Sequence, residues 1–459
     1  MLVAAAITGG AGTATAQGFA VNEHGSCAMG RSGTGVAAPC RDGSAMFFNP
    51  AGLAGSIGWT FSGGVTLIAA GGSFTDDLTG TVTDLANDPI PVPHGYLSYG
   101  INDRFAAGVG VFVPYGLGTK WPDTFEGRFN GYDNDLKSIY VQPTLAYQVH
   151  PKVSVGAGFD LVFGSVKLTQ RVDLSEFPVP GLGGLTFASL GIPFHTDAAD
   201  AQLNGSATGF GGHVGVLLQP TDRVSVGVRY MTRVKLDYSG TVDFEPAATA
   251  VLPPGNPLAG PLGLDPTQPL PLSAVLDGQF AATGAFADQG VKTAITLPDQ
   301  LAAGIAFRAT DALTVLADYQ WINFKTFDTL PINFQKTTTP DREVIENYKA
   351  THAARFGFDW ATSDRLTLRA GYLYHTAAAP PQTVTPLLPE GKRNELTVGL
   401  GYAVSRAVRA DLAYQYIRQQ DRRGRVREGP GAQAPTEALN SGLYEFFAHL
   451  VGATFTVSF

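Results

Sequence analysis

Residues 153–163 read V-S-V-G-A-G-F-D-L-V-F. The odd-numbered positions, Phe159 and Phe163 among them, are all apolar, whereas the even-numbered positions include small or polar residues such as Gly156 and Asp160. A strand points successive side chains to opposite faces, so an alternation with period two gives one apolar face. This stretch therefore predicts a β-strand that is apolar on one face only.

The same alternation recurs along the chain and predicts an all-β protein. We expect about 14 strands, most of them well beyond the roughly 5–6 residues of an ordinary globular strand. The predicted strands are 57–70, 91–101, 104–115, 136–149, 152–170, 208–219, 222–243, 290–308, 311–325, 344–361, 364–377, 391–404, 407–420 and 442–459.

The connections between the predicted strands alternate between short and long. Tight turns such as 100–104 and 149–152 are followed by long loops, of which 171–207 and 244–289 are the longest. An outer-membrane barrel has short periplasmic turns, long extracellular loops and an even number of antiparallel strands. A soluble secreted β-protein is the alternative, but it would not separate its turns in this way. We therefore predict a transmembrane antiparallel β-barrel in the bacterial outer membrane.

The composition fits a surface that faces lipid. Only 15% of the 459 residues are charged, against about 25% in soluble domains, and 56 residues are glycine. The aromatic content of 10% excludes a disordered chain, and the net charge of −8 argues against nucleic acid as a partner. No apolar run reaches the roughly 20 residues that a membrane-spanning helix needs.

The first 56 residues lack the long alternation. Residues 1–16 end in the A-x-A pattern that precedes a signal-peptide cleavage site. We therefore interpret them as the remnant of a signal peptide, and the alternative is an unstructured tail. A barrel of about 14 strands would leave a hole. We therefore expect the glycine-rich residues 17–56 to form an N-terminal hatch that plugs the barrel of residues 57–459, although a periplasmic tail is the alternative. The terminal Phe459 fits recognition by the barrel assembly machinery.

Short motifs also punctuate the chain. They are Gly18-Phe19, Asn22-Glu23, Gly30-Arg31, Phe48-Asn49-Pro50-Ala51-Gly52-Leu53, Ile101-Asn102-Asp103, Tyr115-Gly116-Leu117, Gly209-Phe210-Gly211, Val234-Lys235-Leu236-Asp237, Leu297-Pro298-Asp299, Trp321 with Phe324, and Pro389 to Arg393. Each is weakly specific alone. In this order and spacing, which spans nearly the whole mature chain, they resemble the FadL family of outer-membrane transporters for long-chain fatty acids and, in one branch, aromatic hydrocarbons.

The resemblance implies a transporter of hydrophobic molecules, most simply long-chain fatty acids, and not an enzyme. In that family the ligand lodges between extracellular loops and enters the barrel. It leaves sideways through a gap at a kink in the third strand when the hatch moves. The hatch Asn-Pro-Ala that lies against this kink corresponds to Asn49, Pro50 and Ala51, flanked by Phe48 and Gly52. The alternatives are an aromatic-hydrocarbon channel of the same family, a general porin, and an outer-membrane enzyme or adhesin.

The predicted third strand contains three candidates for the kink, which are Gly108, Gly110 and Pro114. Proline cannot donate a hydrogen bond to the ladder and is confined to sheet edges and bulges. Pro114 therefore marks broken pairing and an opening in the wall, or else it ends the strand at its loop.

The two longest loops are unusually apolar, and a large exposed apolar patch needs a reason. We expect a ligand groove there, and the alternative is that the loops pack on each other. The groove candidates are Phe177, Leu185, Phe187, Phe194 and Leu262.

Few residues indicate other chemistry. Lys167 is our candidate contact for a fatty-acid carboxylate. Cys27 and Cys40, for which the family motif does not call, either form a disulfide after export or remain free thiols. The histidine spacing does not indicate a metal site, and no cofactor is expected. The expected partners are a hydrophobic ligand, outer-membrane lipid with lipopolysaccharide, and the assembly machinery, and we expect a monomer.

Overall fold

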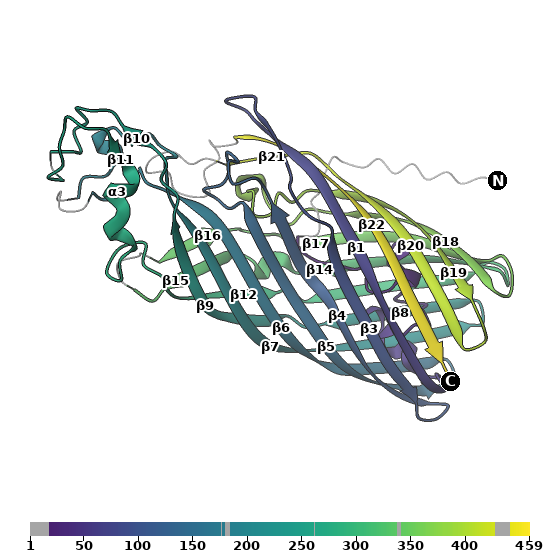
Figure 1. The fold of residues 1–459 in the computed structure, drawn as a ribbon. Helices are drawn as coiled ribbons and strands as arrows, with labels where there is room; N and C mark the ends of the chain where they lie inside the picture. The colour runs from purple at the N-terminus through teal and green to yellow at the C-terminus, as the bar shows by residue number, and fades with distance from the viewer. Residues whose placement is uncertain (1–17, 176, 180–183, 261, 337–340, 427–440) are drawn as a thin grey trace.

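The computed structural model describes residues 18–175, 177–179, 184–260, 262–336, 341–426 and 441–459. Within this part of the chain, 14 antiparallel strands close into a barrel (Figure 1), as the sequence predicts. The last strand pairs with the first along its whole length, from Thr60 opposite Ser458 to Asp76 opposite Gly442. This pairing leaves the described sheet without an open edge at the seam, which the bilayer requires.

The barrel strands follow one another around the sheet in chain order, and several consist of two segments. They are β1 (Gly58–Asp76), β3 (Ile90–Gly100), β4 (Phe105–Lys120), β5 (Asp133–His150), β6 (Val153–Asp173), β7 (Asp197–Thr221), β8 with β9 (Val224–Met231 and Val234–Pro246), β12 with β13 (Gln289–Leu297 and Gln300–Arg308), β14 with β15 (Leu313–Ile322 and Thr329–Phe334), β16 with β17 (Arg342–Ile345 and Thr351–Ala361), β18 (Leu366–His375), β19 (Arg393–Ala403), β20 (Val408–Gln419) and β22 (Gly442–Ser458).

The remaining elements are short. The N-terminal segment contains α1 (Ser26–Met29), α2 (Ala45–Phe48) and η1 (Pro50–Leu53). The loops carry β2 (Val82–Asp84), η2 (Ala188–Leu190), β10 (Val251–Leu252), β11 (Leu270–Pro271), α3 (Leu272–Leu276), η3 (Asp277–Phe280), η4 (Phe324–Thr326), η5 (Pro381–Thr383) and β21 (Arg422–Gly424). In the described residues, no helix combines the length and the apolar character needed to cross a membrane.

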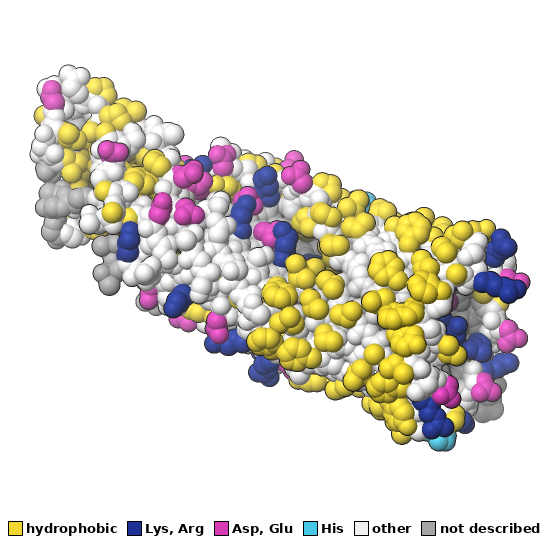
Figure 2. Space-filling view, turned by 60° about the horizontal axis from the view of Figure 1, so that its bottom comes forward, with side chains coloured by type: hydrophobic (Ala, Val, Ile, Leu, Met, Phe, Trp, Pro, Cys, Tyr) yellow, Lys and Arg dark blue, Asp and Glu magenta, His cyan; other side chains and the backbone are white. Residues whose placement is uncertain are grey.

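The alternation read from the sequence separates the outside of the barrel from the inside. On β6, Phe159 and Phe163 point outward with exposed fractions of 48% and 45%, whereas Asp160 is fully buried on the inner face. Apolar side chains from neighbouring strands form a broad band over one half of the barrel face shown in Figure 2. This band is the surface that contacts lipid in the outer membrane.

Several strands continue past the apolar band, and here the predicted boundaries are wrong. β1 extends to Asp76 rather than ending at residue 70, and β7 begins at Asp197 rather than at residue 208. Residues 197–207 contain Asp, Gln, Asn and Ser, so their outward face is polar and the apolar alternation disappears. Residues 171–173 and 197–207 of the expected loop 171–207 are therefore strand.

Residues 18–56, which we call the N-terminal segment, lie inside the barrel (Figure 1). Inward side chains of the wall hold them from several sides. Asp318 on β14 accepts hydrogen bonds from the backbone N–H groups of Gly35 and Val36, at 2.8 and 3.0 Å. Further contacts are the ion pair between Arg31 and Asp359, the bond from Arg229 to the carbonyl of Phe47, and the bond from the N–H of Ser26 to Thr454. The expected signal peptide, residues 1–16, is outside the described residues.

Candidate functional site

The barrel wall is interrupted between β3 and β4. The two strands pair from Gly100 opposite Ala106 up to Gly95 opposite Val111, and the pairing stops there. β3 continues along β1 as far as Ile90, while β4 continues along β5 as far as Lys120. Two strands that should be neighbours therefore separate beyond Val111.

The separation coincides with a break in the register of β4 itself. The pairing of β4 with β5 is irregular between Phe112 and Tyr115, and Pro114 lies inside this break rather than at the end of the strand. Proline lacks the N–H that the ladder requires, which explains why the irregularity falls here. Gly108 and Gly110 lie in the regularly paired part of the strand, so they do not mark the break.

The start of the N-terminal segment occupies the edge that β3 leaves. The backbone N–H of Val21 donates to the carbonyl of Pro114 at 2.9 Å, and the N–H of Gly116 donates to the carbonyl of Phe19 at 3.0 Å. Ala20 and Tyr115 thereby form an isolated antiparallel bridge. These bonds satisfy backbone groups that would otherwise be unpaired at a sheet edge.

Aromatic side chains fix this contact from inside the barrel. The ring of Phe19 is buried against Phe324, Phe327 and Tyr115, with centroid distances of 5.2, 5.4 and 6.1 Å. The hydroxyl of Tyr115 in turn donates to the carbonyl of Pro298 at 2.7 Å. The start of the N-terminal segment is thus packed as well as hydrogen-bonded.

A cavity of about 420 Å³ passes from the barrel interior to this opening. Its lining includes inward residues, such as Leu136 and Leu450, and residues that face the outside of the wall, such as Val111 and Ile139. Because both faces of β5 contribute, the cavity crosses the wall where β3 and β4 separate. Most of the lining is apolar, and it includes Gly18 and the residues that follow it.

The inner end of the cavity carries charge. Arg393 points inward from the start of β19, and its guanidinium makes no hydrogen bond or ion pair with the described residues. Glu395 on the same face is bound by His375 at 2.9 Å and by Gln415 at 2.5 Å. Glu390, just before the strand, accepts backbone hydrogen bonds, and burial raises the pKa of its carboxyl group. The cavity therefore offers one cation that lacks a direct partner.

Lys167 does not fit its expected role. It lies on the outward face of β6, two residues from Ser165, and its ammonium group pairs with Asp133 at 2.7 Å. It is not part of the cavity lining. Arg393 was noted only within a family motif, and its signal in the sequence is a lone arginine between Glu390 and Glu395 at the start of an alternating strand.

The resemblance implied that the turn of residues 48–52 lies against the break in β4. In the structure the turn lies elsewhere. The side-chain amide of Asn49 donates to the carbonyls of Val36 and Val216, at 2.7 and 3.0 Å, and its oxygen accepts from the N–H of Ala51. Gly215 on β7 and Gly227 on β8 are close enough that a side chain there would meet Asn49.

Small residues of the wall therefore decide where this turn packs. Pro50 and Ala51 lie over Gly156 on β6, Phe48 packs across Gly35, and Gly52 faces Pro39. Phe19–Val21 make the hydrogen bonds to the break in β4, and the ring of Phe47 packs against Phe112 at its edge.

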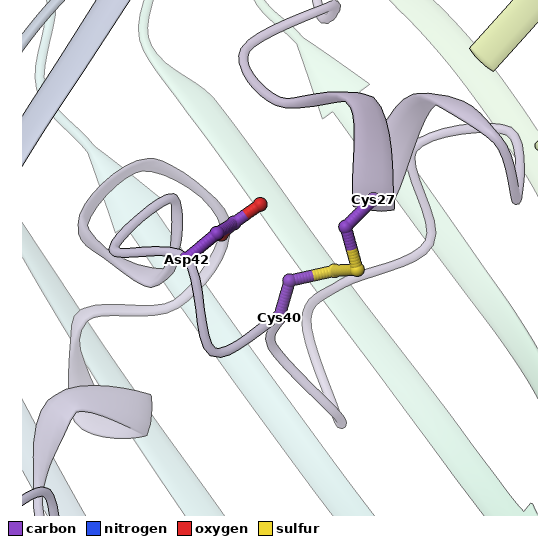
Figure 3. Close-up of side chains that lie close together, drawn as sticks. All are labelled: Cys27, Cys40 and Asp42. Atoms are coloured by element: carbon purple, nitrogen blue, oxygen red, sulfur yellow. A yellow bond between two sulfur atoms is a disulfide. The ribbon is translucent and has the colours of Figure 1, made fainter. Parts of the chain in front are cut away.

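Cys27 and Cys40 form a disulfide within the N-terminal segment (Figure 3). The bridge joins α1 to the loop before α2. Asp42 lies beside it, and its pKa is raised by burial. The two bridged sulfurs cannot act as thiolate ligands, so this cluster is not a metal site.

The long loops form a small apolar core of their own. Phe187 is buried in it together with Leu258, Leu272 and Phe286, and Leu262 packs against it. Leu185 is exposed. Phe177 and Phe194 line a separate cavity of about 400 Å³ that also contains Arg171 and His195. The loops therefore pack on each other, with Phe177 also packing against Phe286 of this core, and the role of the cavity as a ligand groove stays a prediction.

These features define an outer-membrane β-barrel whose lumen holds its own N-terminal segment and whose apolar cavity reaches the lipid-facing wall. The chain belongs to the family described as outer membrane protein transport protein (OMPP1/FadL/TodX), whose sequence model matches residues 7–459. It is accordingly an outer-membrane transport protein for hydrophobic molecules and not an enzyme.

Individual relatives are distant but cover almost the whole chain. The long-chain fatty acid transport protein of Salmonella typhi is 25% identical over 423 residues, which is 90% of this chain and 89% of the relative. Outer membrane protein P1 of Haemophilus influenzae is 23% identical over 446 residues, covering 91% and 89%. The crystal structure of a Pseudomonas aeruginosa FadL homologue has a TM-score of 0.77 at 20% identity, covering 96% of this chain and 100% of that one. The toluene transporter TodX of P. putida has a TM-score of 0.68 at 19% identity, covering 97% and 99%.

Proposed function

We propose that this protein carries long-chain fatty acids across the outer membrane and releases them sideways through the opening between β3 and β4. The observation that carries the proposal is the cavity that joins Arg393 to the outer wall. Its size is within the range of small-molecule sites, roughly 300–1,000 Å³. An apolar cavity with a single cation lacking a direct partner suits a ligand that has a long apolar chain and one carboxylate.

The proposed route has three stages. A ligand first lodges in the loop cavity beside Phe177 and Phe194. It next enters the cavity inside the barrel, where Arg393 binds its carboxylate. It leaves past Val111 and Ile139 when the start of the N-terminal segment moves away from the edge of β4.

The relatives support a hydrophobic ligand but do not agree on one. The bacterial relative from Salmonella typhi bears the name of a long-chain fatty acid transport protein, whereas TodX is called a toluene transporter. An aromatic hydrocarbon has no anion, so it gives Arg393 nothing to bind. Arg393 therefore favours the fatty acid. Aromatic hydrocarbons remain the second candidate because most of the cavity lining is apolar.

Binding of oleate and of toluene to the purified barrel tests the choice. We expect Arg393→Gln to weaken oleate binding roughly 10- to 100-fold, because a hydrogen bond to a charged group contributes about 1.5–3 kcal/mol. Toluene binding should not change. Lys167→Gln is the matched control, since it removes a cation from the outer wall, and it should leave both ligands unaffected.

The outcomes separate the candidates. Toluene binding without oleate binding would replace the fatty acid by the aromatic hydrocarbon. High ion conductance with neither ligand bound would indicate a general porin and refute both.

A further inference from the structure

The loop between β18 and β19, residues 376–392, folds into the barrel, and we call it the β18–β19 loop. Ala378 and Ala379 are fully buried, and so are Val384 and Glu390 further along the loop. Loops usually run over the surface of a protein, because their backbone polar groups need water. Here the carboxylate of Glu390 takes the place of water by accepting from the N–H groups of Ala378 and Ala379, both at 3.0 Å. This burial indicates a role inside the barrel.

The β18–β19 loop lies between two cavities. Leu388 and Pro389 line the cavity that reaches the wall opening, which we call the inner cavity. Pro386 and Val426 both approach Gly127, and Val426 lines the loop cavity. A Cβ atom on Gly127 would lie 2.7 Å from the ring of Pro386 and 2.8 Å from the side chain of Val426. The linings of the two cavities share no residue, so in the described chain these side chains stand between them.

Individual side chains hold this part of the loop in place. Three of them donate to its backbone carbonyls. They are Trp121 to Pro386 at 3.3 Å, Thr119 to Leu387 at 3.0 Å and Gln419 to Pro389 at 2.7 Å. Pro386 and Pro389 have no N–H to offer a ladder, and none of the described residues 386–389 pairs with a barrel strand. Residues 386–389 can therefore move without unpairing the wall.

The indole of Trp121 is itself fixed by packing. It is fully buried and stacked on Phe125, with a centroid distance of 4.6 Å and an interplanar angle of 15°. Phe125 in turn approaches Gly127, as Pro386 and Val426 do. Side chains packed in this way leave no passage for an alkyl chain or an aromatic ring. A ligand that moves from the loop cavity to the inner cavity therefore has to displace this group.

We propose that the β18–β19 loop is a partition between the loop cavity and the inner cavity, and that a ligand passes when residues 386–389 move away from Trp121. The identity of the ligand rests on the function proposed above. The partition acts on entry into the inner cavity and not on the exit through the wall. Its side chains at Trp121, Phe125 and Pro386 carry no charge, so it delays a fatty acid and an aromatic hydrocarbon alike.

A partition changes rates and not affinity. Weakening it alters neither the free nor the bound ligand, so association and dissociation accelerate by the same factor and Kd is unchanged. Trp121→Phe tests this because it keeps an aromatic ring, removes the bond to Pro386 and changes a residue that lines neither cavity. We expect both rates for radiolabelled oleate, measured by rapid filtration on the full-length purified barrel, to rise about 2- to 10-fold. Trp360→Phe, at an exposed tryptophan of the outer wall, is the matched control and should change neither rate.

Gly127→Ala is a second variant of the same partition. Its methyl group would press on Pro386 and Val426, so both rates should rise again, without any change in hydrogen-bond donors. This variant also decides the question if Trp121→Phe does not assemble.

The outcomes are distinct. Unchanged rates in Trp121→Phe and Gly127→Ala, in barrels with the strand content of the parent, overturn the partition. A changed Kd with an unchanged association rate in Trp121→Phe does so as well, because Trp121 would then act on the bound ligand. Equal acceleration in Trp360→Phe has the same meaning. A parent that binds toluene and not oleate refutes the fatty-acid function, and the exchange of toluene then decides the partition. A parent that binds neither refutes both.

Discussion

The backbone N–H of Gly116 in the barrel wall donates to the carbonyl of Phe19 in the N-terminal segment at 3.0 Å. Beyond Val111, β4 no longer pairs with β3, and the N-terminal segment hydrogen-bonds to its free edge from inside the barrel. Elsewhere, neighbouring strands are joined by long ladders, as from Gly58 opposite Gly100 to Ile68 opposite Ile90. Here the closure consists of two backbone bonds and one aromatic side chain. This weakly paired part of the described wall is where we propose that the ligand leaves.

A reversible cross-link between Ala20 and Tyr115 should abolish transport. The two residues oppose each other in an antiparallel bridge, and their flanking residues make the hydrogen bonds. Side chains of such a pair lie close enough for a disulfide. We expect the oxidised Ala20→Cys/Tyr115→Cys variant to take up oleate at less than about one tenth of the wild-type rate. Reduction should restore uptake. Wild type treated identically controls for the native disulfide, and undiminished uptake by the oxidised variant would show that the ligand leaves elsewhere.

Asn49→Ala should loosen the N-terminal segment without unfolding the barrel. The substitution leaves the carbonyls of Val36 and Val216 without the amide that binds them. Each buried polar group left without a partner costs about 1–3 kcal/mol. Faster hydrogen exchange is therefore expected in residues 34–54, with the barrel strands unchanged. Asn394→Ala, an exposed asparagine on the outer wall, should have no such effect. Equal protection in both variants would contradict the anchoring role of Asn49.

The sequence was sufficient to predict the barrel because its decisive pattern is local. Each lipid-facing strand needs an apolar side chain at every second residue, and that requirement is visible in Phe159 and Phe163 without any knowledge of their neighbours. The strand ends past the lipid band were mispredicted for the same reason. There the outward residues contact water, so Asp197 and the residues after it show no apolar alternation.

The site depends on contacts between distant parts of the chain and was predicted less well. Pro114 indicated the break in strand pairing because proline cannot donate a hydrogen bond to the ladder at any position in a strand. The hydrogen bond from Gly18 to Glu390, by contrast, joins residues that are far apart in the chain, and nothing near either residue indicates the other. Lys167 was expected to contact a ligand inside the barrel, but its side chain is on the outer wall. Adjacent residues of a strand point to opposite faces, so a shift of one residue changes the predicted face. The signal peptide, the assembly partners and the monomeric state stay predictions.

Acidification should weaken the packing of the N-terminal segment through His24. Its ring is buried between Phe47 and Phe112, and burial, together with the nearby His94, lowers its pKa to about 3. A histidine in the unfolded segment has a pKa near 6.5, so as the pH falls it binds a proton before the buried His24 of the folded segment does. The stabilisation is fully present above pH 6.5. It falls by about 1.4 kcal/mol per pH unit as the pH drops from there toward 3.

Between pH 7.5 and 4.5 the expected loss is therefore about 2–3 kcal/mol, measurable as faster hydrogen exchange in residues 20–30. His24→Phe should flatten this dependence, whereas His352→Phe, on the outer surface, should not. If His24→Phe shows the same pH dependence of hydrogen exchange as the wild type, groups other than His24 cause that dependence.

The loop cavity should determine the rate of ligand capture, and Phe194 is the residue to change. Phe194 lines that cavity beside Phe177, while Leu185 in the same loop is exposed and does not contribute to the lining. At low oleate concentration, Phe194→Ala should slow initial binding several-fold because about 1 kcal/mol of apolar contact is lost at this half-buried ring, and Leu185→Ala should not slow it. Phe187→Ala acts differently, since it removes a buried ring from the loop core and should increase proteolysis of the loops. Equal binding rates in the Phe194 and Leu185 variants would mean that ligand reaches the barrel without stopping between the loops.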